Sequence, residues 1–87
     1  MDSGSKFKNY DRSKICVIEP AKGKHTHTLI FLHGLGDSGA SYVSLFDRGG
    51  ILHSPNMKVL LPTAPQMAVT CNNGAQMNSW FDIKVIL

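Results

Sequence analysis

The residues best suited to chemistry in this sequence lie in one glycine-rich stretch, His33-Gly-Leu-Gly-Asp-Ser-Gly39. Glycine lets a backbone turn sharply and approach a bound group without a Cβ in the way. A free N–H in such a loop can donate a hydrogen bond to the oxyanion that develops on an attacked carbonyl, or to a phosphate at a helix N-terminus. The phosphate interpretation is weaker because no Gly-Lys-Ser/Thr sequence follows. A turn that binds nothing is the third interpretation.

Ser38 is a separate candidate for chemistry in the same loop. Gly36-Asp-Ser-Gly39 superficially resembles the nucleophile motif of chymotrypsin-like proteases, but those enzymes need His and Asp far upstream of the serine. It also resembles the Gly-Asp-Ser block of lipases, an interpretation that leaves His33-Gly34 and the segment around Trp80 unexplained. A lysophospholipase or Gly-Asp-Ser-type lipase with Ser38 as its nucleophile is therefore kept as an alternative.

The loop needs secondary structure on both sides to hold it. Residues 15–18 are rich in β-branched side chains and are predicted to form a strand. Residues 27–32 form a stronger predicted strand, whose unbroken apolar run favours burial on both faces. After the loop, residues 40–52 have roughly helical apolar spacing, and Gly49-Gly50 is predicted to end that helix. Residues 57–61 are the next predicted strand.

The order of these elements predicts the fold class. A strand, a loop, a helix and a strand in succession favour a βαβ crossover, and hence a parallel sheet with a helix on one face. Ligands of such sheets bind beyond the carboxyl ends of the strands, where the loop at 33–39 lies. Residues 62–74 are predicted to be a loop without periodicity, and residues 79–87 to hold one more short extended piece. The predicted fold class is α/β.

Several motifs in register resemble one family. A strand followed by the loop at 33–39 resembles the oxyanion loop after the third strand of α/β-hydrolases. From about Thr28 to Ile83 the sequence is similar to the acyl-protein thioesterase and carboxylesterase family, through Leu61-Pro-Thr-Ala-Pro65, Val69-Thr-Cys-Asn72 and Met77-Asn-Ser-Trp-Phe-Asp-Ile83. The resemblance implies the N-terminal part of an α/β-hydrolase fold, a βαβ unit of a mostly parallel sheet that ends before the nucleophile elbow.

The resemblance implies site residues as well. The backbone N–H of Leu35 would be the first oxyanion donor, and Gly34 and Gly36 would contact the substrate beside it. Trp80 would lie near the mouth of the acyl-binding channel, with a core aromatic as the alternative role. No metal or cofactor is implied.

Two further side chains of these motifs are expected to be structural. His33 is expected to orient the loop and not to act as the base of a catalytic triad, and Phe81 is expected in the core.

Cys16 and Cys71 are expected to be buried thiols and not a disulfide, which favours a reducing, cytoplasmic location. The widely spaced His25, His27 and His53 do not favour a zinc site.

The activity implied is hydrolysis of acyl thioesters or carboxylic esters by a serine nucleophile through an acyl-enzyme intermediate. S-acylated proteins or lysophospholipids would be the substrates. The 87 residues hold no convincing Gly-x-Ser-x-Gly elbow, and the acid and histidine that follow it in the family are missing too. We therefore expect a truncated product or an incomplete gene model, inactive as it stands. The alternative from another class is a non-catalytic fragment that binds a partner through an exposed sheet edge.

Composition and charge bear on whether the chain spans a membrane or binds nucleic acid. The sequence is 43% hydrophobic and 17% charged, and it has no apolar run of the roughly 20 residues that a membrane helix needs. Most of the basic residues precede residue 25, without the interleaved aromatic side chains of a nucleic-acid-binding module. Residues 1–13 are predicted to be a flexible polar arm, with at most peripheral contact with an acidic membrane surface. Residues 14–87 are predicted to be a partial α/β-hydrolase domain.

Overall fold

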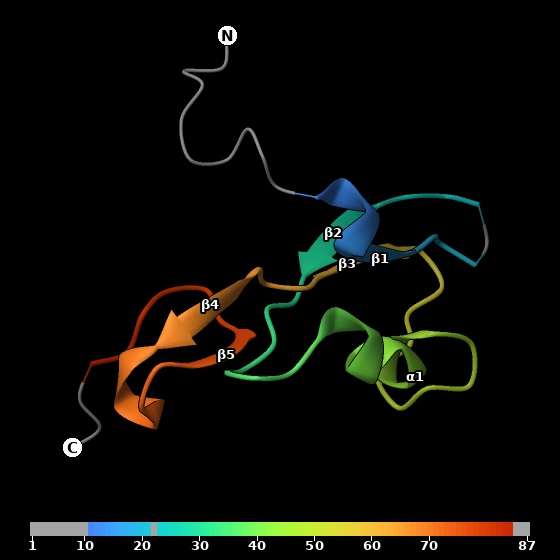
Figure 1. Cartoon of the computed structure of the whole chain (residues 1–87). Coiled ribbons are helices and arrows are strands. Elements are labelled where there is room, and N and C mark those ends of the chain that lie inside the picture. The colour runs from blue at the N-terminus through green and yellow to red at the C-terminus, as the bar shows by residue number, and fades with distance from the viewer. Residues whose placement is uncertain (1–10, 22, 85–87) are drawn as a thin grey trace, which may run out of the picture.

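A computed structural model of the chain describes residues 11–21 and 23–84, in which a three-stranded sheet lies over a short helical segment and a hairpin projects to one side (Figure 1). The sheet has the order β1-β3-β2, with β1 at Ile15–Ile18, β2 at His27–Ile30 and β3 at Met57–Pro62. The central strand β3 pairs parallel with β2 and antiparallel with β1. The predicted parallel pairing across the helical connection is confirmed, and β1 makes the sheet mixed.

Strand β2 is shorter and more exposed than its sequence predicts. It ends at Ile30, and the Ile30 and Leu32 side chains are 61% and 58% exposed. The predicted burial on both faces is wrong, because side chains alternate between the faces of a strand and the helical segment covers only the face that carries Leu29 and Phe31. Among the described residues, Ile30 is level with Leu60 of β3 and Val17 of β1 on the uncovered face.

The helical segment is also shorter than the predicted 40–52. It consists of a 3-10 turn, η2 at Gly39–Tyr42, and one turn of α-helix, α1 at Val43–Phe46. Asp47 ends it in an extended conformation, and Gly49 has a φ of 89° that side-chain-bearing residues avoid. The residues after Phe46 therefore form turns and not further helix.

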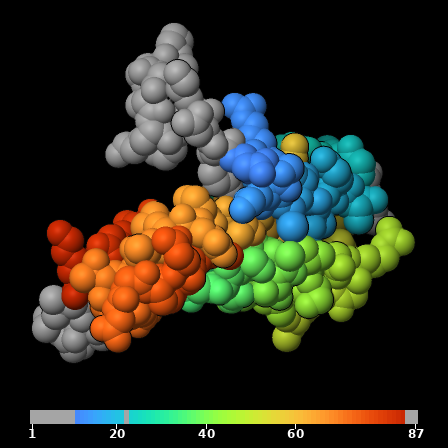
Figure 2. Space-filling model, in the orientation of Figure 1, coloured from blue at the N-terminus to red at the C-terminus, as the bar shows by residue number. Residues whose placement is uncertain are grey.

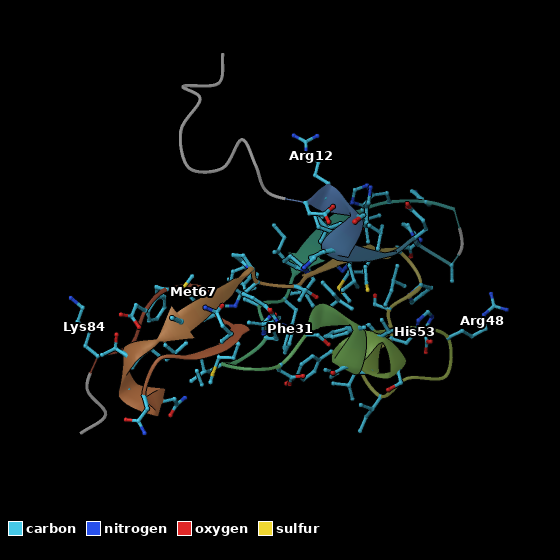
Figure 3. All side chains as sticks on the ribbon, viewed as in Figure 1. Arg12, Phe31, Arg48, His53, Met67 and Lys84 are labelled. Atoms are coloured by element: carbon cyan, nitrogen blue, oxygen red, sulfur yellow. The ribbon has the colours of Figure 1, made fainter. Side chains whose placement is uncertain are left out.

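The core lies between the covered face of the sheet and this helical segment. Phe46, Val59 and Leu61 are almost fully buried there. The ring of Phe31 lies 4.7 Å from that of Tyr42 and 5.7 Å from that of Phe46, measured between centroids, within the range of favourable aromatic pairs. Figure 3 shows Phe31 at the centre of the molecule, whereas the exposed Arg12, Arg48 and Lys84 extend outward from its periphery.

A β-hairpin occupies part of the stretch predicted to be a loop. Strands β4 at Gln66–Val69 and β5 at Ala75–Asn78 pair antiparallel, with the short 3-10 turn η3 at Thr70–Asn72 between them. The extended piece predicted from residue 79 is wrong, since no strand follows β5 as far as Lys84, and residues 85–87 lie outside the described residues. A hairpin signal was present in Asn73-Gly74, whose φ angles are 57° and 78°.

The polar N-terminal arm is described only at its end. Arg12–Lys14 form the 3-10 turn η1, capped by the Asp11 side chain, which accepts a hydrogen bond from the Ser13 N–H. The rest of the predicted arm, residues 1–10, lies outside the described residues. In the described part of the chain, no helix is long and apolar enough to span a membrane.

Gly39 begins the helical segment where the chain passes closest to β3. A Cβ at Gly39 would overlap with the backbone carbonyl of Leu61. Since Leu61 is in the central strand and fully buried, neither backbone can move away easily. We predict that Gly39→Ala lowers the free energy of unfolding by roughly 1–3 kcal/mol or more, as measured by urea denaturation. Gly34→Ala is the matched control, because a Cβ there meets nothing within 4 Å, and equal losses in the two variants would contradict the prediction.

A carboxylate connects the turn of the hairpin to the chain that follows it. Asp82 accepts hydrogen bonds from the Thr70 backbone N–H (2.8 Å) and hydroxyl (2.7 Å). These two bonds, in that order, hold the pKa of the Asp82 carboxyl below its ordinary value of 3.8. The folded state therefore binds this proton less readily than the unfolded state.

We predict that Asp82 stabilises the fold above pH 3.8 and that this contribution is lost as the pH falls from 3.8 through the lower folded-state pKa. The urea midpoints of the wild type and Asp82→Asn should differ at about pH 6 and approach each other as the pH falls below 3.8. Asp47→Asn serves as the control, because the Asp47 side chain has no hydrogen bond within the described ranges. A difference between wild type and Asp82→Asn that does not depend on pH would refute the role of the charge.

Candidate functional site

The glycine loop contains one tight turn, at residues 34–37. The Asp37 N–H donates to the Gly34 carbonyl oxygen at 3.2 Å, which closes a four-residue turn. Gly36 occupies the third position with a φ of 79°, as a type II turn requires. Leu35 occupies the second position, whose N–H takes no part in closing such a turn. Gly36 is thus required by its backbone conformation, whereas Gly34 has neither a positive φ nor a close neighbour.

His33 connects this turn to the loop after β3. Its buried ring lies between two backbone groups, with Nδ1 2.6 Å from the Gly34 carbonyl oxygen and Nε2 2.9 Å from the Ala64 nitrogen. Because Nε2 accepts the Ala64 N–H, it carries no proton, and the Nδ1–H must donate to Gly34. Both ring nitrogens are occupied, so His33 orients the loop, as the sequence predicts.

Two residues at the end of the hairpin hold the turn from the opposite side. The Asn78 carbonyl accepts from the Gly36 N–H (2.8 Å), and the Asn78 side-chain amide donates to the Asp37 carbonyl (2.8 Å). The Trp80 indole N–H donates to the His33 carbonyl (2.9 Å), with the two rings 5.0 Å apart. We call residues 78–80 the strap. The loop runs beside the end of β5 in Figure 1, and the hairpin and loop surfaces meet in Figure 2.

The second half of the loop is held by polar side chains. The Asp37 carboxylate accepts from the Tyr42 hydroxyl at 2.6 Å and from the Ser38 N–H at 2.8 Å. Hydrogen bonds from the Tyr42 hydroxyl, and to a smaller extent from the Ser41 side chain, hold the pKa of the Asp37 carboxyl below its ordinary value. The Tyr42–Asp37 bond also raises the pKa of the Tyr42 hydroxyl above its ordinary value of 10.0. At the end of the loop the Gly39 N–H donates to the Thr63 hydroxyl (2.9 Å).

The Leu35 N–H differs from the N–H groups that follow it in this loop. From residue 36 to residue 39 each backbone N–H donates a hydrogen bond, to Asn78, Gly34, the Asp37 carboxylate and Thr63 in turn. The Leu35 N–H has no acceptor anywhere in residues 11–21 and 23–84, and its side chain is 40% exposed. A donor that is fixed in a rigid turn and free to bond is the arrangement that oxyanion stabilisation needs.

Three of the four residues in the Ser-Trp-Phe-Asp motif hold neighbouring segments in place through hydrogen bonds. Ser79 is buried, and its N–H donates to the Pro65 carbonyl at 3.0 Å. Trp80 is bound to the loop, and Asp82 to Thr70. Phe81 is 67% exposed, so its predicted place in the core is wrong, because its neighbours in the motif make the anchoring contacts and its own side chain is left outside.

Ser38 lies in the site but is not paired with a base. Its hydroxyl lies 3.1 Å from the Ser41 hydroxyl. The hydrogen bonds of the four histidines in the described segments go to other groups, and both nitrogens of His33 are occupied. The geometry therefore gives the lipase alternative no activated nucleophile at Ser38.

Sequence reasoning missed Asn78, which nothing distinguishes from the other asparagines of the hairpin until the turn at residues 34–37 is placed beside it.

Comparison with known proteins identifies the family of the chain. A sequence model of the phospholipase/carboxylesterase family matches residues 13–87. Acyl-protein thioesterase 1 of Yarrowia lipolytica is 50% identical over 66 residues, covering 75% of this chain and 29% of that protein. Acyl-protein thioesterase 1 homolog 1 of Dictyostelium discoideum is 43% identical over 60 residues, covering 69% of this chain and 26% of that protein.

The fold agrees with the sequence comparison. The crystal structure of Zea mays acyl-protein thioesterase 2 superimposes with a TM-score of 0.71 at 36% identity, covering 84% of this chain and 30% of that one. The predicted α/β-hydrolase fold is thereby confirmed, and the chain spans less than a third of the length of the relatives that it matches. On the match over residues 13–87, the chain belongs to the phospholipase/carboxylesterase family.

Proposed function

We propose that this chain supplies the oxyanion-binding part of a serine-dependent acyl-protein thioesterase. The observation that carries the proposal is the Leu35 N–H, which lies in a closed turn and has no acceptor among the described residues, while the four N–H groups that follow it in the loop are all bonded. An unoccupied donor held in a fixed turn stabilises negative charge on a carbonyl oxygen without reorganising during the reaction. Family membership and the names of the relatives supply the reaction type.

In this mechanism a serine attacks the acyl carbonyl, and charge develops on its oxygen. The Leu35 N–H donates to that oxygen, and Gly34 and Gly36 let the carbonyl approach the turn because they carry no side chain. Gly36 acts through its conformation, since its own N–H is bonded to Asn78. The matched 66 residues cover 29% of the Yarrowia lipolytica relative, and the nucleophile, its base and the orienting acid would belong to the part of such a thioesterase that they do not cover.

The proposed substrates are S-acylated proteins, following the names of the relatives, with lysophospholipids as a second acyl class. Trp80 is half-buried, and its indole N–H is occupied by the His33 carbonyl. It would therefore meet an acyl chain through the face or edge of its ring and not through a hydrogen bond. A cytoplasmic location is supported by Cys16 and Cys71, which are half-buried and unpaired.

A binding fragment is the second candidate. Its support is β2, which pairs within the described residues only with β3 and leaves Ile30 largely exposed. An open apolar edge can add a strand from a partner. The candidate differs from the thioesterase in needing neither the free Leu35 N–H nor the turn that holds it.

We predict that the 87-residue chain alone hydrolyses an activated short-chain thioester no faster than buffer does. The physical reason is that Ser38, the serine of the loop, has no histidine beside it to take its proton. The measurement is thiol release by the purified chain and by its Ser38→Ala variant. Turnover that disappears in the variant would establish the lipase alternative instead.

The donor role of Leu35 can be tested by replacing the segment of the Yarrowia lipolytica thioesterase that aligns with this chain by the matching 66 residues of this chain, and we call the product the exchanged thioesterase. Leu35→Pro should lower its kcat about 100- to 1,000-fold, because proline has no N–H. Proline is common at the second position of a type II turn, so the fold and the melting temperature should be retained.

Leu35→Ala is the matched control, since it keeps the N–H and should leave kcat nearly unchanged. Equal kcat values for the proline and alanine variants would exclude Leu35 as the donor. A folded exchanged thioesterase without activity would count against the proposed function as a whole.

A further inference from the structure

We propose that Asn78 is a positioning residue that fixes the direction of the Leu35 N–H. The inference rests on the proposed function and adds to it a residue that sequence reasoning missed. Asn78 is the last residue of β5, and it reaches the glycine loop across more than forty positions of sequence.

Asn78 bonds to the two backbone groups that flank one peptide unit, one in the unit before it and one in the unit after it. Its carbonyl accepts from the Gly36 N–H at 2.8 Å, and its side-chain amide donates to the Asp37 carbonyl at 2.8 Å. The peptide between Gly36 and Asp37 is the one that follows the third position of the turn, where φ is 79°. Glycine at such a position has other backbone conformations open to it. A residue that holds the groups on each side of that peptide selects one of them.

The strap fixes the other end of the turn as well. The Trp80 indole N–H holds the His33 carbonyl at 2.9 Å, so the Leu35 N–H lies between two anchored points. Ser79, between the two anchors, is itself buried and bonded to the Pro65 carbonyl. The strap is thus held by its own neighbours and can impose its geometry on the loop. Trp80 is also a proposed substrate contact, so Asn78 gives the cleaner test.

Asn78→Asp is the sharpest variant, because it keeps the shape of the side chain and replaces the amide donor with an oxygen that repels the Asp37 carbonyl. Asn72→Ala is the matched control, since Asn72 is an exposed hairpin asparagine whose side chain bonds only to the Met77 sulfur, at 3.5 Å. In the exchanged thioesterase, Asn78→Asp should lower kcat about 10- to 100-fold with KM unchanged. Asn72→Ala should leave both constants as they are.

Each result decides between two proposals. If Leu35→Pro abolishes turnover but Asn78→Asp matches Asn72→Ala in kcat, the positioning role is wrong and the proposed function stands. If Leu35→Pro has no effect, the proposed donor is wrong, and the positioning role is wrong with it. A kcat loss in Asn78→Asp that equals its unfolded fraction would show a merely structural role and overturn the inference.

A second measurement uses the 87-residue chain itself and needs no turnover. By amide hydrogen exchange, the Gly36 N–H should be protected and the Leu35 N–H should not. Asn78→Asp keeps the backbone carbonyl that accepts from Gly36, but its side chain repels the Asp37 carbonyl and should loosen the loop, so the Gly36 N–H should exchange at least about 10-fold faster, while Asn72→Ala leaves it unchanged. Equal Gly36 exchange rates in the wild type and Asn78→Asp, or an unprotected Gly36 in the wild type, would overturn the inference.

Discussion

The loop between β2 and η2 can present the Leu35 N–H in a fixed direction only because hydrogen bonds hold the backbone on both sides of Leu35. Glycine-rich backbone loses more conformational entropy on ordering than any other, so a loop of this composition stays in one shape only where bonds fix it. Here the bonds come from three directions: the imidazole of His33, the carboxylate of Asp37, and the strap at residues 78–80. The remainder of the fold brings these groups to the same place.

The sheet and the hairpin contribute in different ways. Strand β3 lies at the centre of the sheet, and the chain that follows it supplies Thr63 and Ala64, which bind Gly39 and His33. The hairpin then returns the chain so that Asn78 and Trp80 face the loop from the far side. The Thr70–Asp82 bonds and the Ser79–Pro65 bond close this return path. Thus many residues of the motifs that identify the family make the hydrogen bonds that hold the hairpin against the loop.

The sequence predicted those elements whose physical cause is local. The apolar runs at residues 15–18 and 57–61 formed strands, and the glycines of the loop formed a turn where φ must be positive. It failed where the cause lay elsewhere in the chain. The burial of Ile30 depends on what covers the sheet, and the hairpin strands, whose side chains are mostly exposed or half-buried, carry no clear alternation of apolar and polar residues. Asn73-Gly74 was the one local signal for the hairpin.

The residues of the candidate site also differ in whether their roles have a local cause that the sequence can show. Leu35 could be selected from sequence because the position of an oxyanion donor follows from the strand, the loop and the family resemblance. Asn78 could not, because its role exists only once a peptide forty residues earlier in the chain lies beside it. His33 was predicted to orient the loop and not to act as a base, and the Ala64 N–H on Nε2 leaves it no lone pair with which to accept a proton from a nucleophile. His33 thus acts through its hydrogen bonds to the backbone, which join the glycine loop to the chain after β3 and help to hold the turn that contains Leu35.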